Sequence, residues 1–516
     1  MESFWNAGAS EFTMGLDPLG VRQVDQAIER RWASNITTIS FRARYLTLLT
    51  WLVSEYWSRR ASSATASAQS EVDWDVDALM LYLARLEFIA VAATLLDDEQ
   101  EGADTTRLIG SDIYANELGA LRTSGSVSLP ETGGSSSTLL NTYFMPCKGF
   151  GLLTETADRN AVLATERGHQ LRAIRAAAVK NCPLVQQIFD GGVVTREAIQ
   201  EAAPHFSMNR LSQATGECEA LVEAMTVPYS DSPAVQGSYS RYMQSTSWAF
   251  ANLRTQPTSS AELIQRAFGA AAGLRSHASD SVEHAYASFE FYRRVHHALE
   301  VLLMSVSQEL QNGCNTCEEV IEIWRADTTA LAPRVINIAQ WPTRPFEVPV
   351  RDLPALLRPG FLTNRLTPAQ CNSLPARTCA LYATAMIACD INQVRTLQML
   401  GRWSTVTGVA LRVMDAVKRF EDAPLSDLVT RLLEDIVIEI HLSTTLRKMR
   451  TGKCSLRMYR EGGRLIATGI GVNAGYSADR LSNVLNMWAD IGALARGPGQ
   501  FSVTERGRAL QTSAGQ

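Results

Sequence analysis

The segment that decides the fold class is SADRLSNVLNMWADIGALARGPGQFSVTERGRAL, residues 477–510. Ser477 suits the N-cap of a helix that starts near Asp479. Apolar residues then recur at helical spacing and predict one buried stripe, made of Leu481, Leu485, Trp488 and Ile491. We therefore expect three polar side chains to lie largely off that stripe, namely Arg480, Asn483 and Asn486.

A turn, a hairpin and a closing helix follow the first helix. The turn is Ile491–Leu494, the hairpin spans 495–503, and Thr504–Gly507 opens the last helix. This order resembles the winged-helix family of DNA-binding domains, over the end of the chain only. The resemblance implies that the helix contacts double-stranded DNA and that Arg480 and Asn483 reach base edges.

Charge points to the same part of the chain. Residues 441–516 hold eleven Lys or Arg and four Asp or Glu, a net charge of +7 that leaves -12 for residues 1–440. Seven of the basic residues form a cluster that could position DNA phosphates: Arg447, Lys448, Arg450, Lys453, Arg457, Arg460 and Arg464. The alternative is a solvated basic face on a winged module that contacts protein.

The closing signature occurs twice. Ala164–Leu171 (ATERGHQL) parallels Val503–Leu510 (VTERGRAL), and a Gly-Leu-Leu turn precedes the first copy. Two winged modules would explain this, and a chance match of a short string is the alternative. If both copies close a module, each threonine should cap the following helix, and Leu171 and Leu510 should be buried equivalently.

The remainder of the chain is predicted to be helical. At 516 residues, 46% apolar and 20% charged, it can bury a large core, and wholesale disorder is excluded. We expect a mainly α, multi-domain protein with one or two winged-helix modules carrying short β-hairpins. The predicted parts are an N-terminal helical segment (1–60), a winged-helix-like module with a Gly/Ser-rich insertion (76–178), a helical domain (179–340), a Pro-rich connector (341–376), a helical segment (377–440) and the basic winged-helix module (441–516).

Composition also bears on location. The apolar run 79–96 carries Arg85 and Glu87, which are costly at a bilayer centre, so a buried core helix is expected in place of a membrane span. The first 15 residues lack the pattern of a signal peptide, and nine cysteines suit reduced thiols. A cytoplasmic protein without membrane contact is expected.

Three other patterns give weaker signals. The glycines of 469–475 follow GxGxxxG spacing, but too little chain remains for a dinucleotide-binding fold. Cys314 and Cys317 form a CxxC pair without a second pair, and His296 with Glu300 is one pair on a helix face. We therefore expect no metal, no cofactor and no recognisable catalytic site.

The N-terminal segment carries a second resemblance. Asp17–Gly20, Asn35–Thr37 and Phe41–Tyr45 are similar to the opening of large bacterial proteins of mobile-element and anti-phage defence loci. Within it, Arg42 and Arg44 could touch phosphate, although ion pairing inside the fold is the simpler interpretation.

These observations favour a DNA-binding or scaffolding subunit, such as one of a bacterial anti-phage defence complex, that contacts DNA through the C-terminal winged helix and binds a protein partner. The alternative is a helical adaptor whose winged modules bind a partner protein. An enzyme whose site is assembled from distant residues is the third interpretation.

Overall fold

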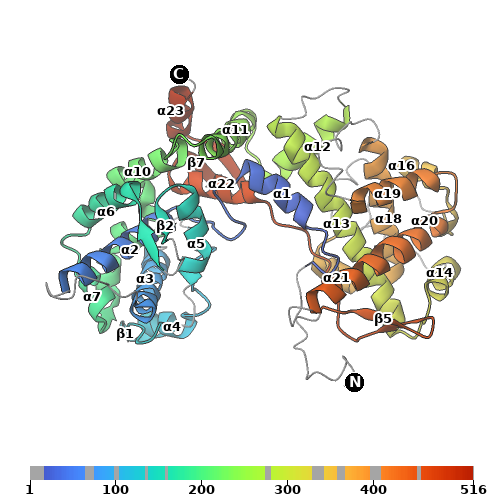
Figure 1. The fold of residues 1–516 in the computed structure, drawn as a ribbon, viewed down its shortest axis with the longest axis horizontal. Coiled ribbons are helices and arrows are strands. Elements are labelled where there is room, and N and C mark those ends of the chain that lie inside the picture. The colour runs from blue at the N-terminus through green and yellow to red at the C-terminus, as the bar shows by residue number, and fades with distance from the viewer. Residues whose placement is uncertain are drawn as a thin grey trace. The chain divides into compact units, whose positions relative to one another are not determined.

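The structure is a computed structural model that describes residues 17–63, 75–97, 104–133, 138–156, 161–273, 281–327, 342–356, 366–394, 408–449 and 455–514. Helices predominate in these ranges, and the strands found there form four two-stranded antiparallel sheets (Figure 1). The expected mainly α fold with short β-hairpins is confirmed.

The chain divides into two compact units, and each unit is discontinuous in sequence. Unit 1 comprises 1–28 and 264–478, and unit 2 comprises 29–263 and 479–516. Two of the division points lie inside helices, α1 (Gln23–Trp32) and α12 (Ser260–Gly273).

This division differs from the predicted boundaries. The predicted basic module, 441–516, is split between Ala478 and Asp479, so its basic cluster belongs to unit 1 and its helix and wing to unit 2. The predicted 76–178 module is part of unit 2 and has no boundary of its own. Long-range pairing causes the difference, because residues 1–28 complete unit 1 and residues 479–516 complete unit 2, and local composition carries no trace of that pairing.

Unit 1 is built around one long helix, α13 (Val282–Gln311), which is buried along most of its length (Figure 1). α18 (Ala376–Val394) packs along it. The other elements of the unit are α14 (Cys317–Ala326), η4 (Pro345–Glu347), η5 (Val350–Asp352), α16 (Leu353–Leu356), α17 (Pro368–Ser373), α19 (Gly408–Arg419), α20 (Leu425–Leu432), a π-helical turn η7 (Leu433–Ile438), α21 (Glu439–Met449), β5 (Met458–Glu461) and β6 (Arg464–Ala467).

Buried carboxylates of α13 hold the segment that leads to the end of unit 1. Glu300 accepts hydrogen bonds from the amide of Gly475 at 3.0 Å and from Arg22 at 2.8 Å. Glu290 accepts from the Tyr476 hydroxyl at 2.8 Å. Because Glu290 and Glu300 are fully buried, these bonds give otherwise costly charges their partners.

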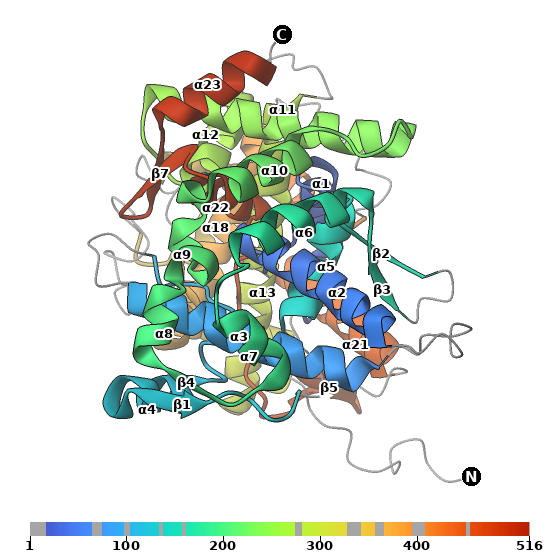
Figure 2. The same cartoon turned by 90° about the vertical axis from the view of Figure 1, so that its left-hand side faces the viewer.

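Unit 2 has α2 (Arg44–Ser63) and α3 (Val76–Leu96) at its centre (Figure 2). Around them lie α4 (Ala115–Ser124), α5 (Thr138–Gly149), α6 (Glu166–Ala178), α7 (Leu184–Asp190), α8 (Arg196–Glu201), α9 (Ala203–Phe206), η3 (Met208–Gln213), α10 (Thr215–Thr226), α11 (Pro233–Thr255), α22 (Arg480–Asp490) and α23 (Glu505–Ala514). The strands are β1 (Ser126–Ser128), β2 (Leu153–Glu155), β3 (Val162–Ala164), β4 (Val193–Thr195), β7 (Leu494–Gly497) and β8 (Gln500–Val503).

Among the described helices, α3 alone is long and apolar enough to cross a membrane by length and composition. Most of that helix is buried inside the protein. Arg85 donates to the carbonyl oxygen of Phe189 at 2.7 Å, and Glu87 accepts from the amide of Leu139 at 2.8 Å. The two charges that the sequence places in this run therefore have partners within the core, as a core helix requires.

Candidate functional site

Two parts of unit 2 are built in the same way, and we call them module 1 (α5, β2–β3, α6) and module 2 (α22, β7–β8, α23). In module 1 the hydroxyl of Thr165 lies 2.6 Å from the carbonyl oxygen of Gly151 and 3.2 Å from that of Leu152. It also accepts from the amide of Gly168 at 3.1 Å. Thr165 thus caps α6 and ties it to the turn before the hairpin.

Module 2 repeats this arrangement at Thr504. Its hydroxyl lies 2.7 Å from the carbonyl oxygen of Gly492 and 2.9 Å from that of Ala493, and it accepts from the amide of Gly507 at 3.1 Å. The predicted hairpin, threonine cap and closing helix are therefore confirmed in both copies. The burial prediction holds for Leu171, which is 2% exposed, but Leu510 is only half-buried because α23 lies at the edge of unit 2 (Figure 1).

Each module also has an ion pair between its hairpin and its first helix, with the charges reversed. In module 1 Lys148 of α5 binds Glu155 of β2 at 2.9 Å. In module 2 Asp490 of α22 binds Arg496 of β7 at 2.7 Å. Glu155 and Arg496 occupy the same position of the repeat, four residues after the turn glycines Gly151 and Gly492, so the modules share their architecture and differ in charge.

The helix α22 corrects two sequence predictions. Its N-cap is Asp479, whose carboxylate accepts from the amide of Ser482 at 2.7 Å, and not Ser477. Arg480 and Asn483 do not lie off the buried stripe, because both are buried. They donate to the carbonyl oxygens of Ile36 and Thr37, each at 2.7 Å, so residues distant in sequence cover the polar side of the helix.

Asn486 and Asp490 of α22 are also buried, although both line the pocket described below. Burial lowers the pKa of Arg480. The side chains predicted to read base edges are thus engaged inside unit 2.

The predicted basic cluster lies on α21 and the β5–β6 hairpin of unit 1, which are neighbours in Figures 1 and 2. Three of its members are exposed, namely Arg447, Arg460 and Arg464. Lys448 donates to the carbonyl oxygen of Asp17 at 2.6 Å, and partial burial lowers its pKa. Arg457 is buried, and Arg450 and Lys453 lie outside the described residues.

Arg42 and Arg44 both form buried ion pairs, as the simpler interpretation of the sequence holds. Arg42 binds Asp490 at 3.1 Å, and Arg44 binds Glu217 at 2.9 Å. Arg175 binds Glu217 as well, at 2.9 Å. Burial works to raise the pKa of Glu217, but the two guanidinium groups outweigh it and lower that pKa to about 2.

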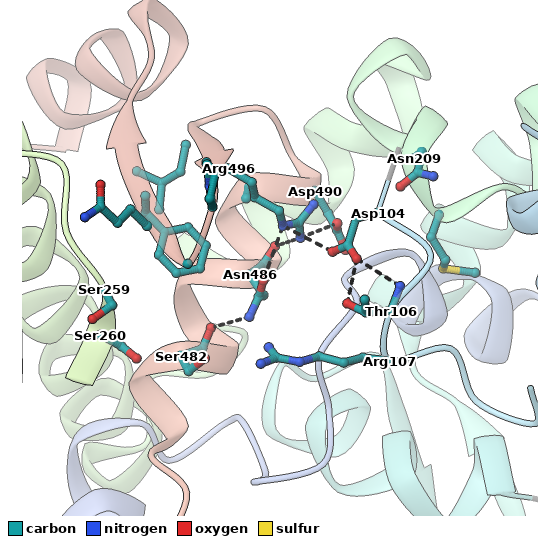
Figure 3. Close-up of a pocket in the computed structure, with 18 of the residues that line it drawn as sticks. Asp104, Thr106, Arg107, Asn209, Ser259, Ser260, Ser482, Asn486, Asp490 and Arg496 are labelled. Carbon is teal, nitrogen blue, oxygen red and sulfur yellow. Dashed lines mark hydrogen bonds and ion pairs between the residues drawn. The ribbon is translucent and has the colours of Figure 1, made fainter. Parts of the chain in front are cut away.

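A pocket of about 730 Å³, with both polar and apolar lining, opens beside the hairpin of module 2 (Figure 3). Its lining comes from the loop before α4, η3, the start of α12 and module 2 itself. The edge of β8 is extended there by Thr258, whose amide donates to the carbonyl oxygen of Phe501 at 3.2 Å while the Phe501 amide donates back at 2.9 Å. An antiparallel bridge therefore joins the hairpin side of the pocket to the segment before α12.

The two carboxylates that line this pocket are already paired. Asp490 accepts from Arg42 at 3.1 Å, from the amide of Ala43 at 2.8 Å and from Arg496 at 2.7 Å. Asp104 lies 3.8 Å from Arg42 and 3.6 Å from Arg496. Burial tends to raise the pKa of Asp104, but hydrogen bonds and these arginines outweigh it, so its pKa lies below the usual value.

Arg107 is one of several lining residues that sequence reasoning missed. Its backbone has φ +60°, a conformation that side chains with a Cβ rarely adopt. Its guanidinium carbon lies 4.7 Å from the centre of the Phe41 ring, and the side chain extends into the pocket toward Ser482 (Figure 3). No pattern around Arg107 marks it, since its loop belongs to no repeat and its neighbours in space come from other elements.

Comparisons with protein-family models, with curated proteins and with solved structures find no match to this chain.

Proposed function

We propose that this protein is a nucleic-acid-binding or scaffolding subunit of a larger complex. In this proposal it contacts the phosphate backbone, and the helix α22 does not read bases. The observation that carries the proposal is the exposure of three arginines on α21 and on the two sides of the β5–β6 hairpin, namely Arg447, Arg460 and Arg464, which we together call the basic face. Within the described part of the chain, these three side chains form no ion pair.

The chemistry of this face suits a phosphate backbone. Guanidinium groups bind phosphate bidentately and are always charged. Tyr459 of β5 is 38% exposed between them in sequence and offers a ring on which a base can stack. The tight turn Gly462–Gly463, with φ of +55° and +81°, holds the hairpin in a register that pairs Arg460 with Leu465 and Arg464 with Glu461, so the two arginines extend from opposite sides of the hairpin.

The burial of Arg480 and Asn483 gives the proposal its second part. Both side chains already donate to backbone carbonyls, so reading bases would require those bonds to break. Binding through arginines alone is sequence-tolerant. A cytoplasmic role in an anti-phage defence complex, as the N-terminal resemblance implies, fits a subunit that must engage varied DNA.

The test is a salt titration with the full chain and a fluorescently labelled random-sequence duplex. We expect the triple replacement of the basic face by alanine to weaken binding to all sequences and to flatten the slope of log K against log salt by up to about 0.9 for each phosphate that is no longer neutralised. The matched control removes three exposed arginines from other elements of unit 1, namely Arg325, Arg344 and Arg419. It changes the net charge equally and should leave most of the affinity.

A protein-interaction adaptor is the second candidate, and module 1 favours it. Met145 of α5 is 57% exposed, and Tyr229, which packs against the turn at Gly151, is 45% exposed. Exposed apolar side chains of this size suit a protein partner. If the basic-face variant keeps both affinity and salt slope while Met145→Glu abolishes co-purification of a partner from the native source, the adaptor function replaces the nucleic-acid one.

A further inference from the structure

The pocket beside the module 2 hairpin combines two guanidinium groups, those of Arg107 and Arg496, with a set of hydroxyl groups. Besides Arg107, its lining includes Ser212, Ser259, Ser260 and Ser482. Serine hydroxyls and a guanidinium are donors that bind phosphate oxygens. The lining thus offers several donors, and Ser482 is the labelled serine toward which the Arg107 side chain extends (Figure 3).

The charge balance of the pocket favours an anion. Two guanidinium groups, those of Arg107 and Arg496, and two carboxylates, those of Asp104 and Asp490, line the pocket, and the buried Arg42 outside the lining faces both carboxylates. Arg42 and Arg496 are engaged by the carboxylates. Arg107 forms no ion pair among the described residues, so its charge is left for a ligand.

The size and the apolar lining narrow the ligand class. A volume of about 730 Å³ is much larger than inorganic phosphate needs and lies within the range of small-molecule sites. Met208, Leu494 and Phe501 add apolar surface on other parts of the wall. A ligand with an apolar ring system and a phosphate group matches both kinds of lining.

We propose that this pocket binds a nucleoside phosphate, with Arg107 as the phosphate ligand. The phosphate is either that of a free nucleotide or that of one residue of a nucleic-acid strand, and in the second case the proposal rests on the proposed function. Arg107 is held there by a loop whose positive φ is unfavourable for arginine by about 1 kcal/mol. Residues kept in such conformations cluster at functional sites, where the surrounding fold imposes them.

The positive φ of Arg107 also allows a substitution that does not strain the backbone. Glycine adopts φ +60° without strain, so Arg107→Gly removes the guanidinium and relieves the backbone. Arg107→Lys keeps the charge but loses the bidentate geometry. The matched control is Arg122→Ala, because Arg122 is exposed on α4, in the same unit, and does not line the pocket.

The experiment is isothermal titration calorimetry of the full chain with adenosine 5′-monophosphate, inorganic phosphate and adenosine, together with anisotropy of a labelled twelve-nucleotide single strand. We expect the monophosphate to bind about 10-fold or more tightly than adenosine, and Arg107→Gly to lose about 10-fold or more of that affinity. Arg107→Lys should fall between them, and Arg122→Ala should match the unaltered chain.

The strand separates the two sources of the phosphate. If Arg107→Gly lowers the affinity for the strand as much as the affinity for the monophosphate, the pocket binds a residue of the strand. If only the affinity for the monophosphate falls, the pocket binds a free nucleotide. The proposal is overturned if the unaltered chain binds neither monophosphate nor phosphate, or if Arg107→Gly leaves monophosphate affinity within about twofold, a difference below about 0.5 kcal/mol. Loss of strand binding in the basic-face variant with intact monophosphate binding tests the proposed function separately.

Discussion

Replacing Gly168 or Gly507 by alanine should destabilise the protein, and by similar amounts. Each glycine lies in the first turn of the closing helix of its module. A Cβ on Gly168 would lie closer than 3.0 Å to the carbonyl oxygen of Leu152, and a Cβ on Gly507 equally close to that of Ala493. Real Cβ atoms do not approach a backbone atom so closely, so helix and turn must separate.

The size of the effect follows from the bonds that the same carbonyls accept. In module 2 the oxygen of Ala493 accepts from the amide of Thr504 at 3.1 Å and from its hydroxyl at 2.9 Å. In module 1 the oxygen of Leu152 accepts the equivalent pair from Thr165, at 3.1 and 3.2 Å. Breaking two such bonds and overpacking the helix against the turn costs about 3 to 5 kcal/mol, and the better helix propensity of alanine returns about 1.

The net expectation is a decrease of about 2 to 4 kcal/mol in the free energy of unfolding for each variant. Urea denaturation followed by circular dichroism measures it, and hydrogen exchange read by mass spectrometry locates the loosening at the hairpin of the altered module. Gly119→Ala is the control, because a Cβ there meets no atom within 4 Å and α4 gains helix propensity.

One result would refute the reasoning. If one of the two variants is as stable as the unaltered chain while the other is destabilised, the two closures are not equivalent, whatever their sequences share. If both variants are as stable as the unaltered chain, the turn moves away from the helix without cost.

Three further outcomes follow from buried charges. Burial lowers the pKa of His441 to about 4 from its usual 6.5, so the unfolded chain binds the proton more tightly than the folded chain does. The free energy of unfolding should therefore fall by about 2 kcal/mol from pH 7 to pH 5. His441→Gln should flatten this part of the plot of urea midpoint against pH. Asp490→Asn removes the nearer of the two carboxylates beside the buried guanidinium of Arg42 and should cost about 3 kcal/mol in the same assay. Replacing the exposed Asp112 by Asn should cost almost nothing. The pKa of Glu217 is lowered to about 2 from 4.5, so its contribution to the free energy of unfolding is present above pH 4.5 and is lost as the pH falls toward 2. Glu217→Gln should remove this acid-dependent loss and should lower the free energy of unfolding at pH 7 by about 3 kcal/mol.

Local patterns predicted the elements of the fold well. The apolar stripe of α22, the β7–β8 hairpin and the capping threonines lie where spacing and residue type place them. The duplicated TERG signature was the strongest guide, because a threonine cap followed by a glycine at a close approach demands those residue types at that spacing.

The same patterns failed where segments that are distant in sequence pack together. Arg480 and Asn483 look like the exposed side of an amphipathic helix, and only the backbone of residues 36 and 37 gives them buried acceptors. The pocket could not be predicted either, because Arg107, Ser260 and Asn486 are 153 and 226 residues apart along the chain, and no local pattern marks Arg107 or Ser260. Periodicity reports which face of a helix is apolar, but not which polar groups another segment will cover.

Because each unit joins segments that are far apart in the sequence, the order of synthesis decides when its buried charges meet their partners. Arg42 and its partner Asp490 are 448 residues apart, and in the other unit His441 and the Pro18 carbonyl that it binds are 423 apart. A ribosome needs roughly 20 to 90 s to cover such a distance. During that interval the charges destined for the interior of both units remain hydrated and unpaired with their final partners. A nonsense mutation near the end of the gene would therefore do more than delete a helix, since the early residues of unit 2 would never receive the segment that buries them.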